Sequence, residues 1–259
     1  MPLAGRTVLV TRAAGQPDEL GPALRALGAR VLEAPLISFQ EPRDWGPADR
    51  AIANLAAYRM VLFTSANAVR RFVERLRRNG VDPEVMTGAR VVAIGPATAA
   101  AAREATGVPV DAVASDFRAE GLLSLLSTGP SLAGWSILLP RAEVAREVLP
   151  ESLRSLGANV EVVTVYRTEP CALPEDVRTM LRRGEFDAIA LTSASMAAGL
   201  AAEVGAQAPG GVVVAALGPV TAKAARDAGI EPAVVAPRAT VKDLAAAIAA
   251  HFDQDGRSS

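Results

Sequence analysis

The chain has 259 residues, of which 50% are hydrophobic and 21% are charged, and its formal net charge is −1. This length suits one large or two small globular domains, and the balanced charge excludes a dedicated nucleic-acid-binding protein, which needs clustered Lys and Arg. One cysteine and one histidine exclude an internal disulfide and a metal site built from Cys and His. Because no apolar run is long enough to span a bilayer and no signal peptide is recognisable, we expect a cytoplasmic protein that contacts no membrane.

The first half of the chain alternates expected strands and helices five times. The strands are short runs rich in Val, Ile and Leu, and the helices open near a proline or close at a glycine. Pro17 is expected to open the first helix, and the arginines of residues 70–78 form the solvated face of a helix whose apolar face contains Phe72. The expected strands are TVLVTR (7–12), ARVLEAPLISF (29–39), MVLFTS (60–65), ARVVAIG (89–95) and VPVDAVA (108–114).

The second half repeats this order. Its segments SILLPR (136–141), NVEVVTVYRTEP (159–170), DAIALTS (187–193) and VVVAALGPVTA (212–222) match the first four strands in turn, and PAVVAP (232–237) follows as the fifth. The residues after the last helix, DQDGRSS, are expected to form a frayed tail. Alternating strands and helices at this spacing predict an α/β fold, in which helices cover both faces of parallel sheets.

One loop occurs in both halves, as IGPATA (94–99) and LGPVTA (217–222). Glycine lets the backbone approach a ligand closely, and proline suits the first helical turn. The free N–H groups and the positive end of the helix dipole would then face an anion. The alternative is that Gly and Pro only make the turn, with the threonine as a helix cap.

Polar residues follow the expected strands at one end. In such sheets, ligands bind beyond the carboxyl ends of the strands, so these residues are candidates for binding a ligand. The alternative for each is a cap or a local hydrogen bond. The candidates are Thr11, Arg12, Ser65, Asn67, Gly95 and Thr98 in the first half, and Arg141, Ser193, Gly218 and Thr221 in the second.

These segments together resemble the uroporphyrinogen-III synthase family. The likeness rests on VTRA (10–13), FTSANAV (63–69), AIGPATA (93–99), LLPRAE (138–143), VYRTEP (165–170), LTSAS (191–195) and LGPVTAKAARDAG (217–229). It covers nearly the whole chain in the family's order, although no single motif is decisive.

The resemblance implies two similar α/β domains, each a parallel sheet in three layers, joined by a two-stranded connector. The chain would cross between them, so that residues 1–35 pack with residues 170–259. Residues 42–165 would form the second domain. Residues 36–41 and 166–169 would be the connector strands.

The resemblance also implies an activity. The family is a lyase of tetrapyrrole and heme biosynthesis that converts hydroxymethylbilane to uroporphyrinogen III, inverting ring D and losing water without a metal or organic cofactor. The substrate's eight carboxylates need many N–H and hydroxyl donors, and Ser193 and Thr221 match hydroxyl positions of the family. Its favoured general acid, a tyrosine of the connector, matches Tyr166, whose alternative role is simple packing.

A rival hypothesis is a hinged two-domain protein that binds or senses a small anion without catalysis, because the fold alone does not separate the two. A nucleotide-dependent transferase is disfavoured, since neither GxxxxGK[ST] nor GxGxxG occurs. No apolar helix face is left over for a partner, so we expect a monomer.

Overall fold

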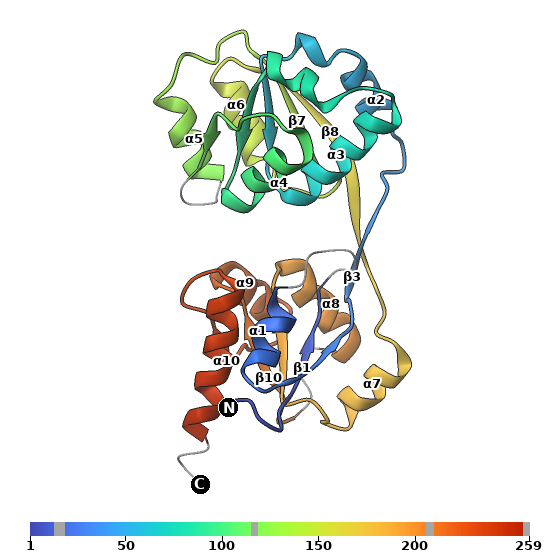
Figure 1. Ribbon diagram of the computed structural model, residues 1–259, viewed down its shortest axis with the longest axis vertical. Helices are drawn as coiled ribbons and strands as arrows, with labels where there is room; N and C mark the ends of the chain where they lie inside the picture. The colour runs from blue at the N-terminus through green and yellow to red at the C-terminus, as the bar shows by residue number, and fades with distance from the viewer. Residues whose placement is uncertain (13–18, 115–118, 206–209, 256–259) are drawn as a thin grey trace. The chain divides into compact units, whose positions relative to one another are not determined.

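The computed structural model describes the backbone of residues 1–12, 19–114, 119–205 and 210–255 (Figure 1). The chain divides into two compact units. Unit 1 consists of Met1–Phe39 and Glu169–Ser259, and unit 2 of Gln40–Thr168. Unit 1 is therefore discontinuous in sequence, and the chain leaves it once and returns once.

Unit 1 is built on a five-stranded sheet with the order β11-β10-β9-β1-β2. Every adjacent pair in it is parallel. Its three central strands, β1, β9 and β10, are short apolar runs that are buried almost throughout, as expected for a parallel sheet between helices, whereas the edge strands β2 and β11 are partly exposed. They are β1 (Thr7–Val10), β2 (Arg30–Glu33), β9 (Ala188–Leu191), β10 (Val213–Ala216) and β11 (Val234–Val235).

Unit 2 carries a six-stranded sheet with the order β3-β8-β7-β4-β5-β6. The pairs from β8 to β6 are parallel. Two of its strands, β3 and β8, continue into unit 1 and carry the chain between the units. The strands are β3 (Ile37–Gln40), β4 (Met60–Phe63), β5 (Arg90–Ala93), β6 (Ala112–Val113), β7 (Ser136–Ala142) and β8 (Asn159–Pro170).

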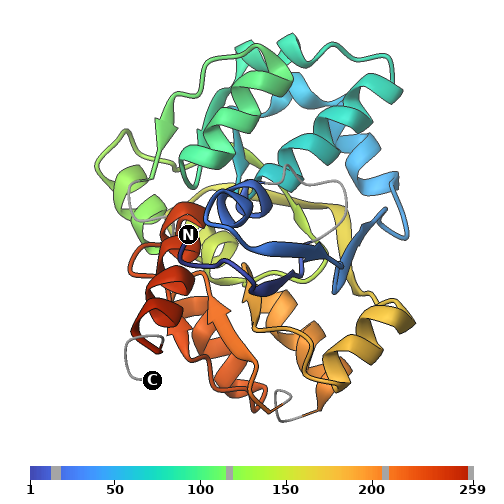
Figure 2. The same cartoon turned by 60° about the horizontal axis from the view of Figure 1, so that its bottom comes forward.

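Helices cover both faces of the sheet of unit 1. On one face α1 (Leu20–Ala26) and α10 (Val241–Asp255) pack side by side, blue and red in Figure 2. On the other face lie α7 (Glu175–Arg182), α8 (Ala194–Val204) and α9 (Pro219–Asp227). Successive strand residues point to opposite faces, so each strand feeds both cores.

The sheet of unit 2 is covered in the same way. On one face lie α5 (Ala119–Ser127) and α6 (Val148–Ser155). On the other lie α3 (Ala66–Arg78) and α4 (Pro96–Thr106), where Phe72 packs against Phe63 with 6.0 Å between ring centroids. The remaining helices are α2 (Gly46–Ala53) and the 3₁₀ helices Leu55–Ala57 and Pro83–Gly88.

The two sheets exchange parts of the sequence repeat. In unit 1, β1 and β2 of the first half join β9, β10 and β11 of the second. In unit 2, β7 and β8 of the second half join β4, β5 and β6 of the first. Each sheet therefore has the complete five-strand order, although neither half of the sequence supplies it alone.

Some expected elements differ from those observed. Residues 29–39 do not form one strand: β2 and β3 lie in different sheets, because Ala34 and Pro35 interrupt the extended run. Helix α10 runs through Asp255, so the first three residues of the expected tail are helical, and the other four lie outside the described residues. Pro17, the expected start of the first helix, lies outside the described residues. No helix in the described ranges is long and apolar enough to span a membrane.

Candidate active site

The carboxyl ends of the parallel strands lie together at one side of each sheet, called here the carboxyl edge. At the carboxyl edge of unit 2, the chain turns from β4 into α3. Ser65 is the N-cap of α3, and its hydroxyl accepts a hydrogen bond from the N–H of Ala68 at 3.0 Å. A serine before an apolar-periodic segment is a preferred cap because it satisfies an N–H with no partner inside the helix. Asn67 lies in the first turn of this helix. One turn of α3 thus brings two of the expected binding residues to this edge.

Tyr166 lies at the same edge, on β8. It pairs with Ala142 at the end of β7, beside β4, and its hydroxyl is 3.3 Å from the Ser65 hydroxyl. Only 8% of Tyr166 is exposed, and burial raises its pKa while the contact with Ser65 opposes that rise. Its phenol therefore keeps its proton at neutral pH.

In unit 1 the carboxyl edge repeats this arrangement without a tyrosine. Ser193 is the N-cap of α8 and accepts from the N–H of Met196 at 3.3 Å, as Ser65 does in α3. Gly218 then precedes α9 as Gly95 precedes α4, each with a proline in the first turn. Each unit therefore presents two helix N-termini at the carboxyl edge of its sheet, where N–H groups face outward.

The two Gly-Pro loops differ from the expectation in detail. The caps are Gly95 and Gly218 rather than the threonines, and both glycines are extended, with φ of −174° and 177°. Thr98 and Thr221 follow inside the helices, each only 6% exposed. A Cβ on Gly218 would lie 3.3 Å from the Cβ of Ala239, so this glycine makes room for a neighbouring loop of the protein.

Two other expected binding residues have local partners. Thr11 is fully buried, and its hydroxyl donates to the carbonyl oxygen of Ala190 at 3.0 Å, so its side chain ties β1 to β9. Arg141 forms an ion pair with Glu147 and donates to the carbonyl of Arg146 at 3.2 Å. Arg12, at the end of β1, is half-buried. We therefore leave Thr11 out of the set that contacts a ligand.

Arg238 was missed in the sequence. It lies next to Ala239 in the loop that packs against Gly218, and Asp243 holds it through two hydrogen bonds of 3.1 and 2.9 Å. The Thr240 hydroxyl accepts from the N–H of Asp243 at 3.1 Å and so caps the start of α10. The pattern T-x-x-D can be seen in the sequence, but the packing of the preceding Ala239 against Gly218 depends on the tertiary structure.

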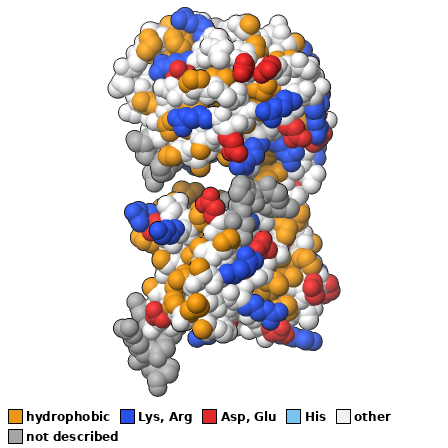
Figure 3. All heavy atoms as spheres, in the orientation of Figure 1, with side chains coloured by type: hydrophobic (Ala, Val, Ile, Leu, Met, Phe, Trp, Pro, Cys, Tyr) orange, Lys and Arg blue, Asp and Glu red, His pale blue; other side chains and the backbone are white. Residues whose placement is uncertain are grey.

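The arginines of α3 lie apart from this edge and are mostly paired. Arg75 contacts Asp49 at 2.5 Å, and Arg78 contacts Glu41 and Glu74, each at 2.7 Å. Figure 3 shows basic and acidic side chains interspersed on this face. This mixture of charges is what we expect of a helix face that is exposed to solvent.

Comparison with known proteins identifies the family. The family model of uroporphyrinogen-III synthase HemD matches residues 18–246. The uroporphyrinogen-III synthase of Synechococcus elongatus is 34% identical over 230 residues, which cover 85% of each chain.

Two solved structures share the fold. A mutant uroporphyrinogen III synthase of Thermus thermophilus matches 98% of this chain and 100% of its own, with a TM-score of 0.67 and 23% identity. The enzyme of Helicobacter pylori matches 97% of this chain and 100% of its own, with a TM-score of 0.63 and 17% identity. By sequence and by fold, the chain belongs to the uroporphyrinogen-III synthase family.

Proposed function

We propose that the protein carries out the family's reaction, the cyclisation of hydroxymethylbilane to uroporphyrinogen III, with Tyr166 as the general acid. The observation that carries this assignment is the contact between Tyr166 and Ser65 at the carboxyl edge of unit 2. A protonated phenol there adjoins helix N-termini that attract carboxylates. An acid and anion-binding groups are both needed for this substrate.

The helix starts at the carboxyl edge of each unit offer binding groups for carboxylates of the substrate. Backbone N–H groups at the starts of α3, α4, α8 and α9 supply donors without adding net charge, which fits a chain of net charge −1. Arg238, which precedes Ala239 in the loop packed against Gly218, adds a guanidinium that Asp243 holds. Its two bonds to Asp243 leave donors for a carboxylate. The other proposed contacts are Arg12, Ser65, Asn67, Gly95, Thr98, Arg141, Ser193, Gly218 and Thr221.

Tyr166 assists the departure of the substrate's hydroxyl. Its proton passes to that oxygen as the carbon–oxygen bond breaks, so that water leaves and an azafulvenium cation forms beside the phenolate. Ser65 can donate to the resulting phenolate, because its bond from the N–H of Ala68 uses only an acceptor site. The proton lost at ring closure restores the phenol. The remaining work is positioning of the chain for attack at ring D, which needs preorganised donors rather than a covalent intermediate.

A product assay tests this function. Hydroxymethylbilane closes spontaneously to the type I isomer, so the purified protein should divert it to type III, resolved by chromatography after oxidation. Type I alone, from a protein shown to be folded by circular dichroism, would contradict the enzyme and favour anion binding without catalysis. A cytoplasmic location and a monomeric state stay predictions, and light scattering after size exclusion tests the second.

A further inference from the structure

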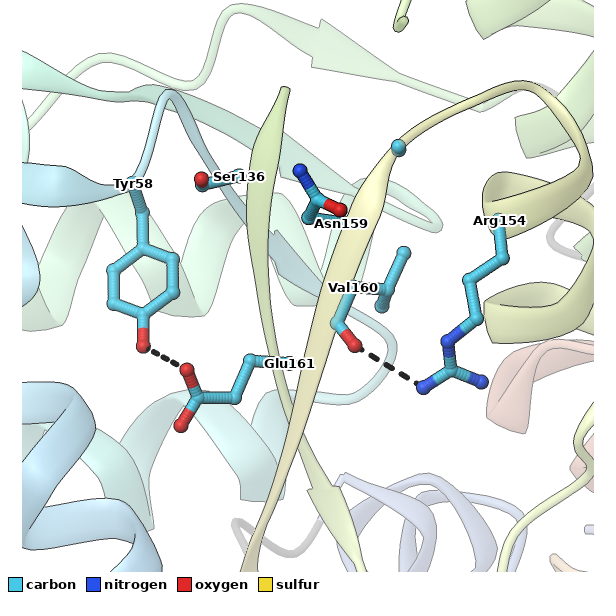
Figure 4. A pocket seen from close by; sticks show the side chains of 7 residues that line it. Tyr58, Ser136, Arg154, Asn159, Val160 and Glu161 are labelled. Carbon is cyan, nitrogen blue, oxygen red and sulfur yellow. Dashed lines mark hydrogen bonds between the residues drawn. The ribbon is translucent and has the colours of Figure 1, made fainter. Parts of the chain in front are cut away.

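Unit 2 has a hollow at the edge of its sheet opposite Tyr166. It lies at the amino ends of β7 and β8 and has a volume of about 410 Å³ (Figure 4). That volume suits a small metabolite. The side chains around it are mostly polar and come from the start of β7, the end of α6, the start of β8 and the segment before β4. They are Tyr58, Ser136, Arg154, Ala158, Asn159, Val160 and Glu161.

Two opposite charges line this hollow without pairing to each other. Glu161 accepts a hydrogen bond from the buried Tyr58 hydroxyl through Oε2, at 2.5 Å. Arg154 donates from Nη2 to the carbonyl oxygen of Val160, at 3.1 Å. Among the described residues, Glu161 Oε1 and Arg154 Nη1 have no further partner. Figure 4 shows the two side chains on either side of β8. One carboxylate oxygen and part of one guanidinium therefore stay available to a ligand.

The internal repeat shows that the fold does not require these charges. The backbone matches closely: the N–H of Asn159 donates to Trp135 and that of Arg30 to Arg6, both at 2.8 Å. The N–H of Arg59 donates to Ser136 and that of Asp187 to Thr7, both at 2.9 Å. These equivalences place Phe186 of unit 1 at the position of Tyr58, and Leu32 at the position of Glu161.

Unit 1 fills those positions with an apolar pair. Phe186 is 2% exposed and packs in the same core cluster as Leu32. The arginine equivalent to Arg154 is Arg25, and Glu33 neutralises it at 2.7 Å. Val162 stands where unit 1 has Glu33, so Arg154 lacks that counter-ion.

The two units differ in the polar groups that they place here. The buried Tyr58 hydroxyl needs a hydrogen-bond partner, which the exposed Glu161 carboxylate supplies, whereas Phe186 and Leu32 need none in the same backbone setting. Departures from a locally consistent design tend to mark functional sites. We propose that this hollow binds a small zwitterion, whose ammonium group contacts Glu161 and whose carboxylate contacts Arg154. Asn159 and Ser136 add neutral donors and acceptors between the two charges.

A titration of the full chain with β-alanine tests the proposal. Backbone amide NMR shifts should change saturably and should centre on residues 159–161. Propionate and n-propylammonium each carry only one of the two charges, so each should bind about tenfold more weakly. The measurement needs no hydroxymethylbilane, so its outcome is independent of the proposed activity.

The repeat supplies matched variants. The double change Tyr58→Phe with Glu161→Leu copies the pair of unit 1, so it should keep the fold and type III synthesis while weakening β-alanine binding about tenfold. Arg154→Gln should weaken it similarly, and Arg25→Gln, at the equivalent position of unit 1, should leave it unchanged. The proposal is overturned by the absence of saturable shifts, by propionate or n-propylammonium binding as tightly as β-alanine, or by undiminished binding to the double variant.

Discussion

The two tyrosines of the chain lie at opposite edges of the same sheet and have different partners. Tyr58 donates to Glu161, a carboxylate, whereas Tyr166 meets Ser65, a neutral hydroxyl. Burial raises the pKa of both, and Glu161 raises that of Tyr58 further. Tyr166 lies at the carboxyl ends of the strands, the end at which parallel sheets bind their ligands, and Tyr58 lies at the amino ends, so position separates two residues that look alike in the sequence.

Tyr166→Phe should lower kcat on the order of a hundredfold, because the ring still packs while the proton donor is lost. Tyr58→Phe is the control and should leave kcat unchanged. Since burial raises the pKa of Tyr166 above its ordinary value, the acid form persists through neutral pH, and activity should fall only above pH of about 10. Steady-state kinetics of both variants across pH checks this. Equal kcat in wild type and Tyr166→Phe would remove the residue from the mechanism.

The raised pKa of Tyr166 also makes the stability of the protein depend on pH. A raised folded-state pKa means that the unfolded chain loses the Tyr166 proton first as pH rises. The free energy of unfolding should therefore show no contribution from this titration below pH of about 10 and should decrease above it. Urea denaturation of wild type and Tyr166→Phe at pH 8 and at high pH measures the difference. If the free energy of unfolding decreased equally in both proteins at high pH, Tyr166 would not be the group that causes the decrease.

Gly218 is constrained by space rather than by backbone strain. Its φ of 177° suits any residue, but an added Cβ would lie 3.3 Å from that of Ala239. Gly218→Ala should therefore cost about 1–3 kcal/mol of unfolding free energy and raise KM by displacing the loop that carries Arg238. Gly88→Ala is the matched control, since its Cβ would meet nothing within 4 Å. Urea titration and kinetics measure both, and a KM unchanged by Gly218→Ala would contradict the role of this loop in binding.

At the scale of elements, α3 and α8 begin in the same way but differ in what their caps touch. Ser65 and Ser193 each accept one N–H bond in the first helical turn, and only Ser65 also meets Tyr166. Replacing either by Ala should cost about 1 kcal/mol of unfolding free energy through the lost cap. Only Ser65→Ala should also shift the pH dependence of kcat. If the pH profiles of kcat were indistinguishable, Ser65 would be only a helix cap and would take no part in the acid step.

At the scale of the whole molecule, the repeat seen in the sequence is not the unit that folds. Residues 40–168 contain five adjacent strands, β4 to β8, and should fold alone. Residues 1–129, the first copy of the sequence repeat, contain β1 and β2 without β9, their neighbour in the sheet, and should fold only in part. Circular dichroism and urea denaturation of the two fragments compare them. A cooperative transition for both would contradict this division.

Much of this molecule follows from local sequence. The apolar runs predict β4, β5 and β7, glycine and proline mark where α4 and α9 begin, and the apolar face of α3 is buried at the residues its period indicates. These features depend on period and on helix ends, which neighbouring residues determine. The helix-capping serines follow from local sequence as well. The resemblance to the family is likewise visible in the order of motifs along the chain.

Tertiary structure alone decided which segments meet. Ser65 and Tyr166 lie 101 residues apart, and Tyr58 and Glu161 lie 103 apart, so no local pattern relates them. The break of residues 29–39 into two strands of different sheets has the same origin, and so does the packing of Ala239, the neighbour of Arg238, against Gly218. Strand order depends on which apolar faces bury together across the whole chain, and that choice is made by packing between distant segments rather than by the period within any one of them.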